Sequence, residues 1–228
     1  MSPAPDLYGR YHKGLRLALG TLLARIGAAD PADRQEWAAV VAEWQALDAT
    51  LEAHSRHEDV YIHPLIREAA PAVAAALDAE HEHLETDLAK LRCGFAEVER
   101  ASAPDERRRA AHVLYLDFSR FVADYFRHLL AEETAAMPEL LRHFTAQKLL
   151  ATLEAMLASI PPDRRMKDLA LMAPALRPDE LTALLAGIAA KAPPPAFQAA
   201  RDVARAARGE AAFEAIDDAL ATTAVGQR

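Results

Sequence analysis

The stretches HSRHEDVYIHP (residues 54–64) and HLLAEETAAMP (residues 128–138) repeat one pattern, H-x-x-x-E-[D/E]-x-x-x-x-P. Each places a glutamate four residues after a histidine: Glu58 after His54, and Glu132 after His128. On a helix, residues four apart project from the same face. An imidazole beside a carboxylate suits iron, manganese or zinc. Two such pairs on two helices predict a metal site within a helix bundle, able to hold two metals.

The residues around these stretches repeat apolar side chains at alternating steps of three and four, which is the period of the buried face of a helix. No strand pattern competes with it, so the first 144 residues are predicted to form an all-α bundle. The predicted breaks are Asp30-Pro31 and residues 102–105. The four expected helices cover about residues 7–28, 32–68 and 71–99, and a stretch that starts after the break at 102–105 and continues to the neighbourhood of Phe144.

Residues 145–228 are predicted to form a separate helical subdomain, rich in alanine and divided by prolines. Pro161-Pro162 ends one helix, and Arg177-Pro178 begins another with proline in its first turn. The prolines at 193–195 precede a further pair of helices. The sequence of this part contains no metal, phosphate or nucleophile motif, so we expect it to be structural or to dock a protein partner.

The composition excludes several classes of protein. A net charge of −8 disfavours nucleic acid as a partner, because phosphate binding requires a basic face. No stretch approaches the roughly 20 uncharged apolar residues of a membrane span, and the first residues lack the order of a secretory signal. Cys93 is the single cysteine, which excludes a disulfide framework and a thiolate metal site. We therefore expect a soluble, cytoplasmic protein that does not engage membranes.

Six polar residues fall on positions that the helical spacing assigns to the core. A single buried histidine is usually satisfied by a neighbouring side chain, but a buried carboxylate without compensation costs several kcal/mol. A metal resolves the conflict, because it replaces water as the partner of these groups. The predicted metal ligands are His12, His54, Glu58, His81, His128 and Glu132.

The other histidines receive plainer interpretations. His83 faces away from the stripe, and His112 and His143 are isolated, so all three are expected at the surface. His57 and His63 fall off the stripe of the second helix and are expected either at the surface or behind the ligands.

Acidic residues near the predicted ligands leave one alternative open. Glu85 comes one turn after His81, at the edge of the stripe, and is a possible extra ligand. Asp59 and Glu133 follow the glutamates of the repeat and are expected near solvent or behind the ligands. Four tyrosines lie near the pattern: Tyr8, Tyr11, Tyr61 and Tyr125. Most of them are expected in the core, where one could donate a hydrogen bond to a bound oxygen species.

The order of these residues resembles the hemerythrin (HHE cation-binding) family over about residues 7–144: one His on the first helix, H-x-x-x-E on the second, one His on the third and H-x-x-x-E on the fourth. The resemblance implies an up-down-up-down four-helix bundle that holds a non-heme di-iron centre. It also implies the ligand roles: His12 and His54 on one iron, His81 and His128 on the other, and Glu58 and Glu132 bridging both together with an oxo or hydroxo group.

The sequence departs from the oxygen-carrying hemerythrins at two places. Those proteins have a second histidine four residues after the one on the third helix, where this chain has Glu85. They also space the fourth-helix histidine and carboxylate five apart, whereas His128 and Glu132 are four apart. The pattern is more similar to hemerythrin-like proteins that repair iron–sulfur clusters under nitrosative stress, or that sense iron and oxygen. Fewer imidazoles imply more positions on iron open to O2, NO or peroxide.

Three functions of different classes remain open from the sequence. The first is binding or sensing of O2, NO or iron by a carboxylate-bridged centre, with the C-terminal helices transmitting the signal. The second is an iron-handling or redox enzyme that repairs iron–sulfur clusters or detoxifies peroxide or NO. The third is a metal-free helical interaction module.

Overall fold

The computed structural model describes residues 5–225, and the side chains of residues 5–222. All regular structure in this part of the chain is helical, with no strand, which confirms the predicted all-α class. None of the described helices combines the length and apolar composition needed to cross a membrane. The chain divides into two compact units. The first contains the chain up to Tyr8 together with Ala18–Leu157, and the second contains Gly9–Leu17 together with the chain from Ala158.

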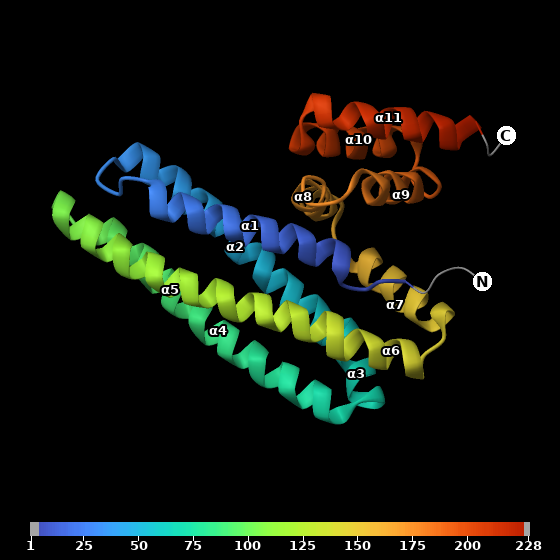
Figure 1. Cartoon of the computed structure of the whole chain (residues 1–228), viewed down its shortest axis with the longest axis horizontal. Coiled ribbons are helices and arrows are strands. Elements are labelled where there is room, and N and C mark those ends of the chain that lie inside the picture. Colours follow the sequence, from blue (N-terminus) through green and yellow to red (C-terminus); the bar gives the residue numbers. More distant parts are fainter. Residues whose placement is uncertain (1–4, 226–228) are drawn as a thin grey trace. The chain divides into compact units, whose positions relative to one another are not determined.

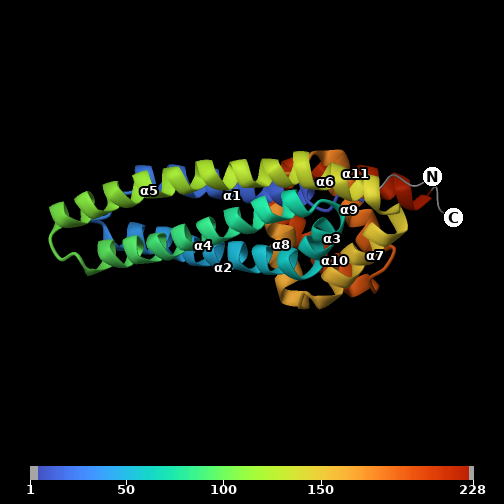
Figure 2. The same ribbon diagram turned by 90° about the horizontal axis from the view of Figure 1, so that it is seen from below.

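Four long helices make up the bundle of the first unit, and successive helices run in opposite directions (Figures 1 and 2). Short connections over residues 29–33 and 101–103 join the first helix to the second and the third to the fourth, as antiparallel neighbours allow. The four are α1 (Gly9–Ala28, with residues 18–28 in this unit), α2 (Arg34–His57), α4 (Pro71–Arg100) and α5 (Pro104–Ala131).

The interior of the bundle is lined by the residues that the spacing of three and four predicted. Trp44 stacks on Phe95 with ring centroids 4.9 Å apart, and it meets Phe118 edge-on at 5.9 Å. Such aromatic pairs contribute about 0.5–1.5 kcal/mol beyond their burial. The apolar residues that recur at steps of three and four along the four helices are buried, including Leu15, Leu19, Leu22, Ile26, Val40, Leu47, Leu51, Leu84, Leu88, Leu91, Leu114 and Phe121.

Both repeated stretches contain a π-turn, which the sequence analysis did not predict. The segment η1 (Glu58–Ile62) follows α2, and η2 (Glu132–Ala136) follows α5. The backbone N–H of His63 donates to the carbonyl of Glu58, and that of Met137 donates to Glu132, five residues back in each case. The next residue is a proline in both repeats, and proline lacks the N–H that an α-helix would require there. The expected continuous helices are therefore each divided by a wider turn.

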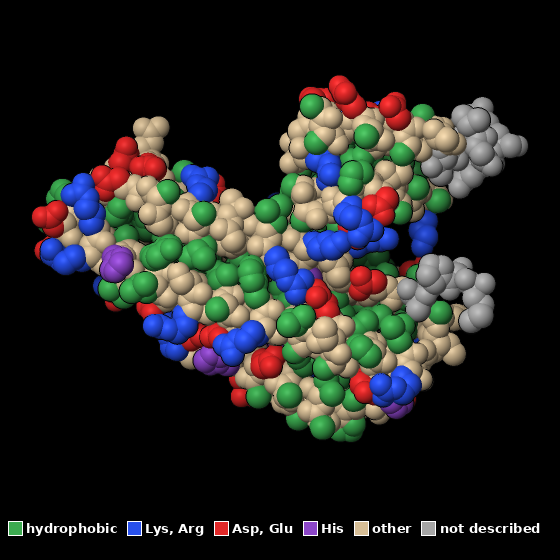
Figure 3. Space-filling model, in the orientation of Figure 1, with side chains coloured by type: hydrophobic (Ala, Val, Ile, Leu, Met, Phe, Trp, Pro, Cys, Tyr) green, Lys and Arg blue, Asp and Glu red, His purple; other side chains and the backbone are tan. Residues whose placement is uncertain are grey.

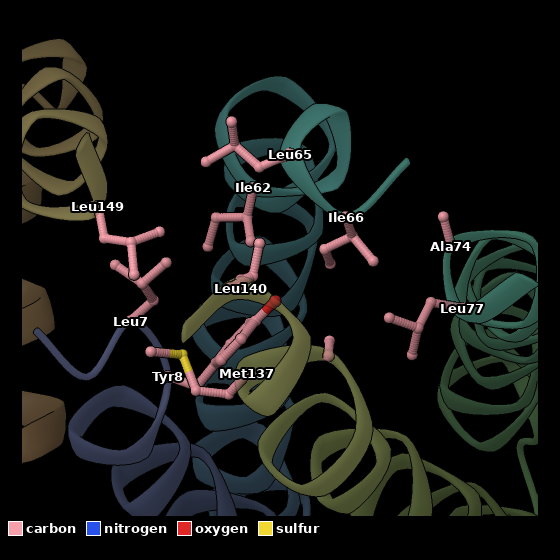
Figure 4. Close-up of a cluster of buried hydrophobic side chains, with 11 residues drawn as sticks. Leu7, Tyr8, Ile62, Leu65, Ile66, Ala74, Leu77, Met137, Leu140 and Leu149 are labelled. Carbon is pink, nitrogen blue, oxygen red and sulfur yellow. The ribbon is translucent and has the colours of Figure 1, made fainter. Parts of the chain in front are cut away.

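The π-turns are followed by two short helices at one end of the bundle, α3 (His63–Ala69) and α6 (Met137–His143). A cluster of buried apolar side chains joins these helices to α4, to α7 (Ala146–Ser159) and to the chain before α1 (Figure 4). In this view Tyr8 lies beside Met137 and Leu140. The eleven residues of the cluster are Leu7, Tyr8, Ile62, Leu65, Ile66, Ala74, Leu77, Ala136, Met137, Leu140 and Leu149.

The second unit is a smaller helical assembly with an apolar core of its own. Helix α10 packs against α8, α9 and α11, and α11 packs against α9. Gly209, at φ +91°, forms the turn between α10 and α11, a conformation that side-chain-bearing residues rarely adopt. Within this unit the hydroxyl of Tyr11 donates to Asp168 at 3.0 Å. Its helices are α8 (Pro162–Met172), α9 (Pro178–Ala189), α10 (Pro194–Arg208) and α11 (Glu210–Val225).

Candidate metal centre

The structure brings four of the predicted ligands together in the interior of the first unit. Glu58, His81, His128 and Glu132 each offer one ligand atom, and these atoms all lie within 4.8 Å of one another. All four side chains are buried, with Glu132 at 0% exposure. Glu58 and Glu132 begin the π-turns that follow α2 and α5, while His81 lies on α4 and His128 near the end of α5, so the bundle itself sets their spacing.

A second group shares the two carboxylates. His12, His54, Glu58 and Glu132 also offer ligand atoms within 4.8 Å of one another, and each of these residues is buried. Each group thus contains two imidazoles, and Glu58 and Glu132 belong to both. All six of the residues chosen from the sequence therefore occur in these two overlapping clusters.

The donor atoms face one another at close range. The Nε2 atoms of His81 and His128 are 3.0 Å apart. His128 Nε2 lies 3.5 Å from Glu132 Oε1, and His81 Nε2 lies 3.7 Å from Glu58 Oε2. In the other group, His54 Nε2 is 3.3 Å from Glu58 Oε1. Two donors bound to one metal at about 2.0–2.2 Å are about 3.0–3.6 Å apart. Three of the four separations fall in this range, and the fourth exceeds it by about 0.1 Å, so the donors are spaced for a shared cation.

Two carboxylates fix the orientation of the facing imidazoles. Asp59 Oδ1 lies 3.2 Å from Nδ1 of His81, and Glu80 Oε2 lies 2.9 Å from Nδ1 of His128. Because a carboxylate accepts hydrogen bonds, each ring keeps its proton on Nδ1 and directs the lone pair of Nε2 inward. Two lone pairs 3.0 Å apart repel each other, and a cation between the rings removes that repulsion.

Glu80 is a residue of the site that the sequence analysis missed. It lies beside the stripe of α4 and is half-buried. Its partner, His128, is 48 residues away on α5. The residue spacing within one helix cannot reveal a contact between two helices, so no local signal pointed to it.

The sequence left two locations open for His63, at the surface or behind the ligands, and the prediction of a surface location is wrong. Its side chain is fully buried, its ring is stacked on His81 with centroids 4.7 Å apart, and Nδ1 lies 2.9 Å from Asp78. The π-turn is the physical reason. In a regular α-helix His63 would lie about 140° around the axis from Glu58, whereas the i→i+5 bond places the two on nearly the same face. The proline that follows was the available signal.

The three histidines expected at the surface lie there, whereas two tyrosines expected mostly in the core, Tyr11 and Tyr61, are only partly buried. His83, His112 and His143 are exposed, and so is Glu85, which belongs to neither cluster. Asp59 is partly exposed while it contacts His81. Few histidine side chains reach the face drawn in Figure 3, and basic and acidic side chains are interspersed there.

The comparison with protein families agrees with this geometry. Residues 5–140 match the model described as the hemerythrin HHE cation binding domain. The chain belongs to the hemerythrin HHE family. The searches of curated proteins and of solved structures each returned no match. The HHE domain coincides with the four-helix bundle and contains the two clusters that share Glu58 and Glu132.

The electrostatics of the HHE domain also fit a cation. Burial raises the pKa of Glu132 well above its usual value, and the neighbouring Glu58 raises that pKa further. The phenol of Tyr8 likewise has a raised pKa, because of burial first and then because of Glu132 and Glu58. Two ionised carboxylates in one dry interior are costly on their own, and a divalent cation reverses that cost. The donor set of nitrogen and carboxylate oxygen is one that iron, manganese and zinc accept.

Proposed function

We propose that the HHE domain holds two iron ions and uses them to bind or sense a small ligand, O2 or NO. His12 and His54 would hold one iron, His81 and His128 the other, and Glu58 and Glu132 would bridge them. The observation that supports this most is the sharing of two carboxylates between two clusters that each contain two histidines. A pair of irons, when bound, supplies coordination positions and electrons for a diatomic ligand.

The residues around the ligands have definite tasks under this proposal. Asp59 and Glu80 hold the Nδ1 protons of His81 and His128, which keeps both Nε2 atoms available as donors. Tyr8 keeps its phenolic proton, because its pKa is raised by burial and by the two glutamates. It can therefore donate a hydrogen bond on the carboxylate side of the centre.

Metal analysis of anaerobically purified protein, followed by optical spectra with and without O2 and NO, tests the proposal. We expect about two irons per chain, because each cluster fits one cation, and a spectrum that changes when either gas is added. Metal-free protein of full stability, or a spectrum indifferent to both gases, would reject it. His112→Ala is the matched control, because His112 is exposed and belongs to none of the groups able to hold a metal.

A redox enzyme is distinguished from a sensor by turnover. A sensor binds its ligand with a fixed stoichiometry, whereas an enzyme consumes peroxide or NO steadily in the presence of a reductant. If wild-type protein shows steady turnover and Glu132→Ala does not, the enzymatic function replaces the sensing function.

We further propose that residues 145–228 dock a protein partner or transmit the state of the centre. The division of the chain supports this, because every cluster able to hold a metal, among the residues described, lies between positions 12 and 132. A chain shortened to the HHE domain that retains iron and its response to O2 and NO, but loses the partner, would agree with this division of tasks.

A further inference from the structure

A cavity of about 500 Å³ opens beside the candidate centre, entirely within the first unit. Both His81 and His128 line it. A molecule inside the cavity therefore meets the two imidazoles of one ligand cluster. Sites for small organic ligands have volumes of about 300–1,000 Å³, whereas a water molecule occupies about 30 Å³. A diatomic ligand does not require a cavity of this size.

One wall of the cavity is apolar and buried. Leu51 belongs to α2, Leu84 and Leu88 belong to α4, and Tyr125 belongs to α5. Each is at most 7% exposed. An occupant gains about 25 cal/mol for each Å² of apolar surface that it buries against such a wall. The wall therefore favours a molecule with an apolar body.

The rim of the cavity is charged, but its cations are already engaged. Arg56 Nη2 donates to Glu52 at 2.8 Å. Arg92 donates twice to Asp48, through Nε at 2.7 Å and Nη2 at 2.8 Å. An arginine held by a carboxylate in this way offers little to an incoming anion, because its donors in the plane are occupied.

The acidic residues of the rim outnumber its arginines. Three carboxylates line the cavity, on Glu52, Asp59 and Glu85, against the two guanidinium groups. Glu85 is exposed and forms no ion pair with the side chains that the structure describes. The surplus negative charge repels anions, while a neutral or positively charged molecule meets no such barrier.

We infer that this cavity binds a small organic molecule with an apolar body and no negative charge, placed so that one end reaches His81 and His128. The inference rests on the proposed metal centre for the chemistry at that end, and it names the class of molecule on which the centre acts or to which it responds. The recognition itself depends on the leucine wall and the acidic rim.

Three probes of nearly the same shape test the inference: benzyl alcohol, benzylamine and benzoate. The protein is used as purified, with leucine methyl groups labelled for NMR, and its iron content is measured in the same sample. Benzyl alcohol and benzylamine should shift the methyl signals of Leu51, Leu84 and Leu88. In protein freed of iron by a chelator, where no metal is present to bind a carboxylate, benzoate should bind at least about tenfold more weakly than they do. Absence of shifts with all three probes, or equal affinity for benzoate, would overturn the inference.

Variants separate the wall from the rim. Leu88→Trp should fill the cavity and weaken the binding of benzyl alcohol at least about tenfold. Leu116→Trp is its control, because Leu116 is 47% exposed and does not line the cavity. Glu85→Lys changes only an exposed charge, so it should strengthen the binding of benzoate and weaken the binding of benzylamine. This variant tests the rim even if Leu88→Trp fails to fold. Unchanged ranking of the probes in Glu85→Lys would contradict the role of the rim.

The same experiment keeps this inference distinct from the proposed function. Probe binding in protein that holds no iron as purified would support the cavity and reject the iron centre. Full iron content without any probe binding would reject the cavity alone.

Discussion

The two repeats of the pattern have the same backbone and the same ligand pair but different residues directly after the turn. Both form a π-turn that begins at the glutamate and ends before the proline. In the first repeat the residue before the proline is His63, which is buried, bonded to Asp78 and stacked on His81. In the second repeat it is Met137, which is buried in the apolar cluster.

The parts of the repeat that serve the site are therefore separate from the part that serves packing. The histidine, the glutamate and the π-turn occur twice, so they belong to the paired clusters around the shared carboxylates. The buried position before the proline is polar where it adjoins a ligand and apolar where it adjoins the cluster shown in Figure 4. The turn creates an inward position, and the neighbours determine its chemistry.

The largest expected effect comes from removing what the repeats share. Glu58→Ala and Glu132→Ala each delete a carboxylate that belongs to both clusters. We expect the metal content to fall from about two per chain to about one or fewer, because either change opens both sites. Elemental analysis of the two variants beside His112→Ala measures this. Equal loss in the two variants supports the symmetry of the repeats, and full retention in either one breaks it.

Exchanging the residue before the proline should have the next largest effect. Met137→His places an imidazole in an apolar cluster, which we expect to lower the free energy of unfolding by about 2–3 kcal/mol. The reciprocal change, His63→Met, should cost less, about 1 kcal/mol, because an apolar side chain of similar size replaces one hydrogen-bonded group. Urea unfolding of both variants tests the order, and a reversed order would contradict our account of this position.

A smaller effect should follow from the residues that orient the imidazoles. His81 is oriented by Asp59, from the π-turn of the first repeat, whereas His128 is oriented by Glu80 from α4. Asp59→Asn and Glu80→Gln should each weaken metal binding about tenfold to a hundredfold without changing its stoichiometry. Competition with a chelator measures the affinities. Glu82→Gln, an exposed change on α4, is the control and should bind metal as the wild type does.

The two repeats show most clearly how much of the fold and of the candidate site could be predicted from the sequence. The spacing of three and four placed His54, Glu58, His128 and Glu132 on buried faces, and the structure buries all four. That inference works because amphipathic periodicity is a local property of one helix. The prediction failed after the glutamates, where continuous helices were expected and π-turns occur.

The failures have two physical causes. A π-turn changes the rotation per residue, so every position after it, His63 first, faces a direction that the α-helical period does not give. Contacts between helices, such as Glu80 with His128, depend on how the helices pack and leave no trace in the spacing of either one. The prolines at positions 64 and 138 were visible in the sequence and identify the first kind of failure.

The smallest expected effect is a dependence of stability on pH, opposite in sign with and without metal. In the metal-free protein the pKa of Glu132 is raised by burial and by Glu58. Between the ordinary carboxyl pKa of 4.5 and the raised value, the folded state holds a proton that the unfolded chain has released. Stability of the metal-free protein should therefore fall as pH rises through this window. The loaded protein should instead lose metal, and with it stability, on acidification, because its ligands must be deprotonated.

Urea unfolding across that window, with and without chelator, measures the two slopes. Glu132→Gln is the control, since it cannot titrate and should lose the slope of the metal-free protein. Slopes of the same sign in both forms would contradict the electrostatic account.

The most direct test of the central claim is a crystal structure of the iron-loaded protein with anomalous scattering recorded at the iron edge. Our account predicts two iron peaks, one beside His12 and His54 and the other beside His81 and His128, with the carboxylates of Glu58 and Glu132 contacting both. A single peak, or iron located at Asp59 and His63 instead of between the two glutamates, would contradict it.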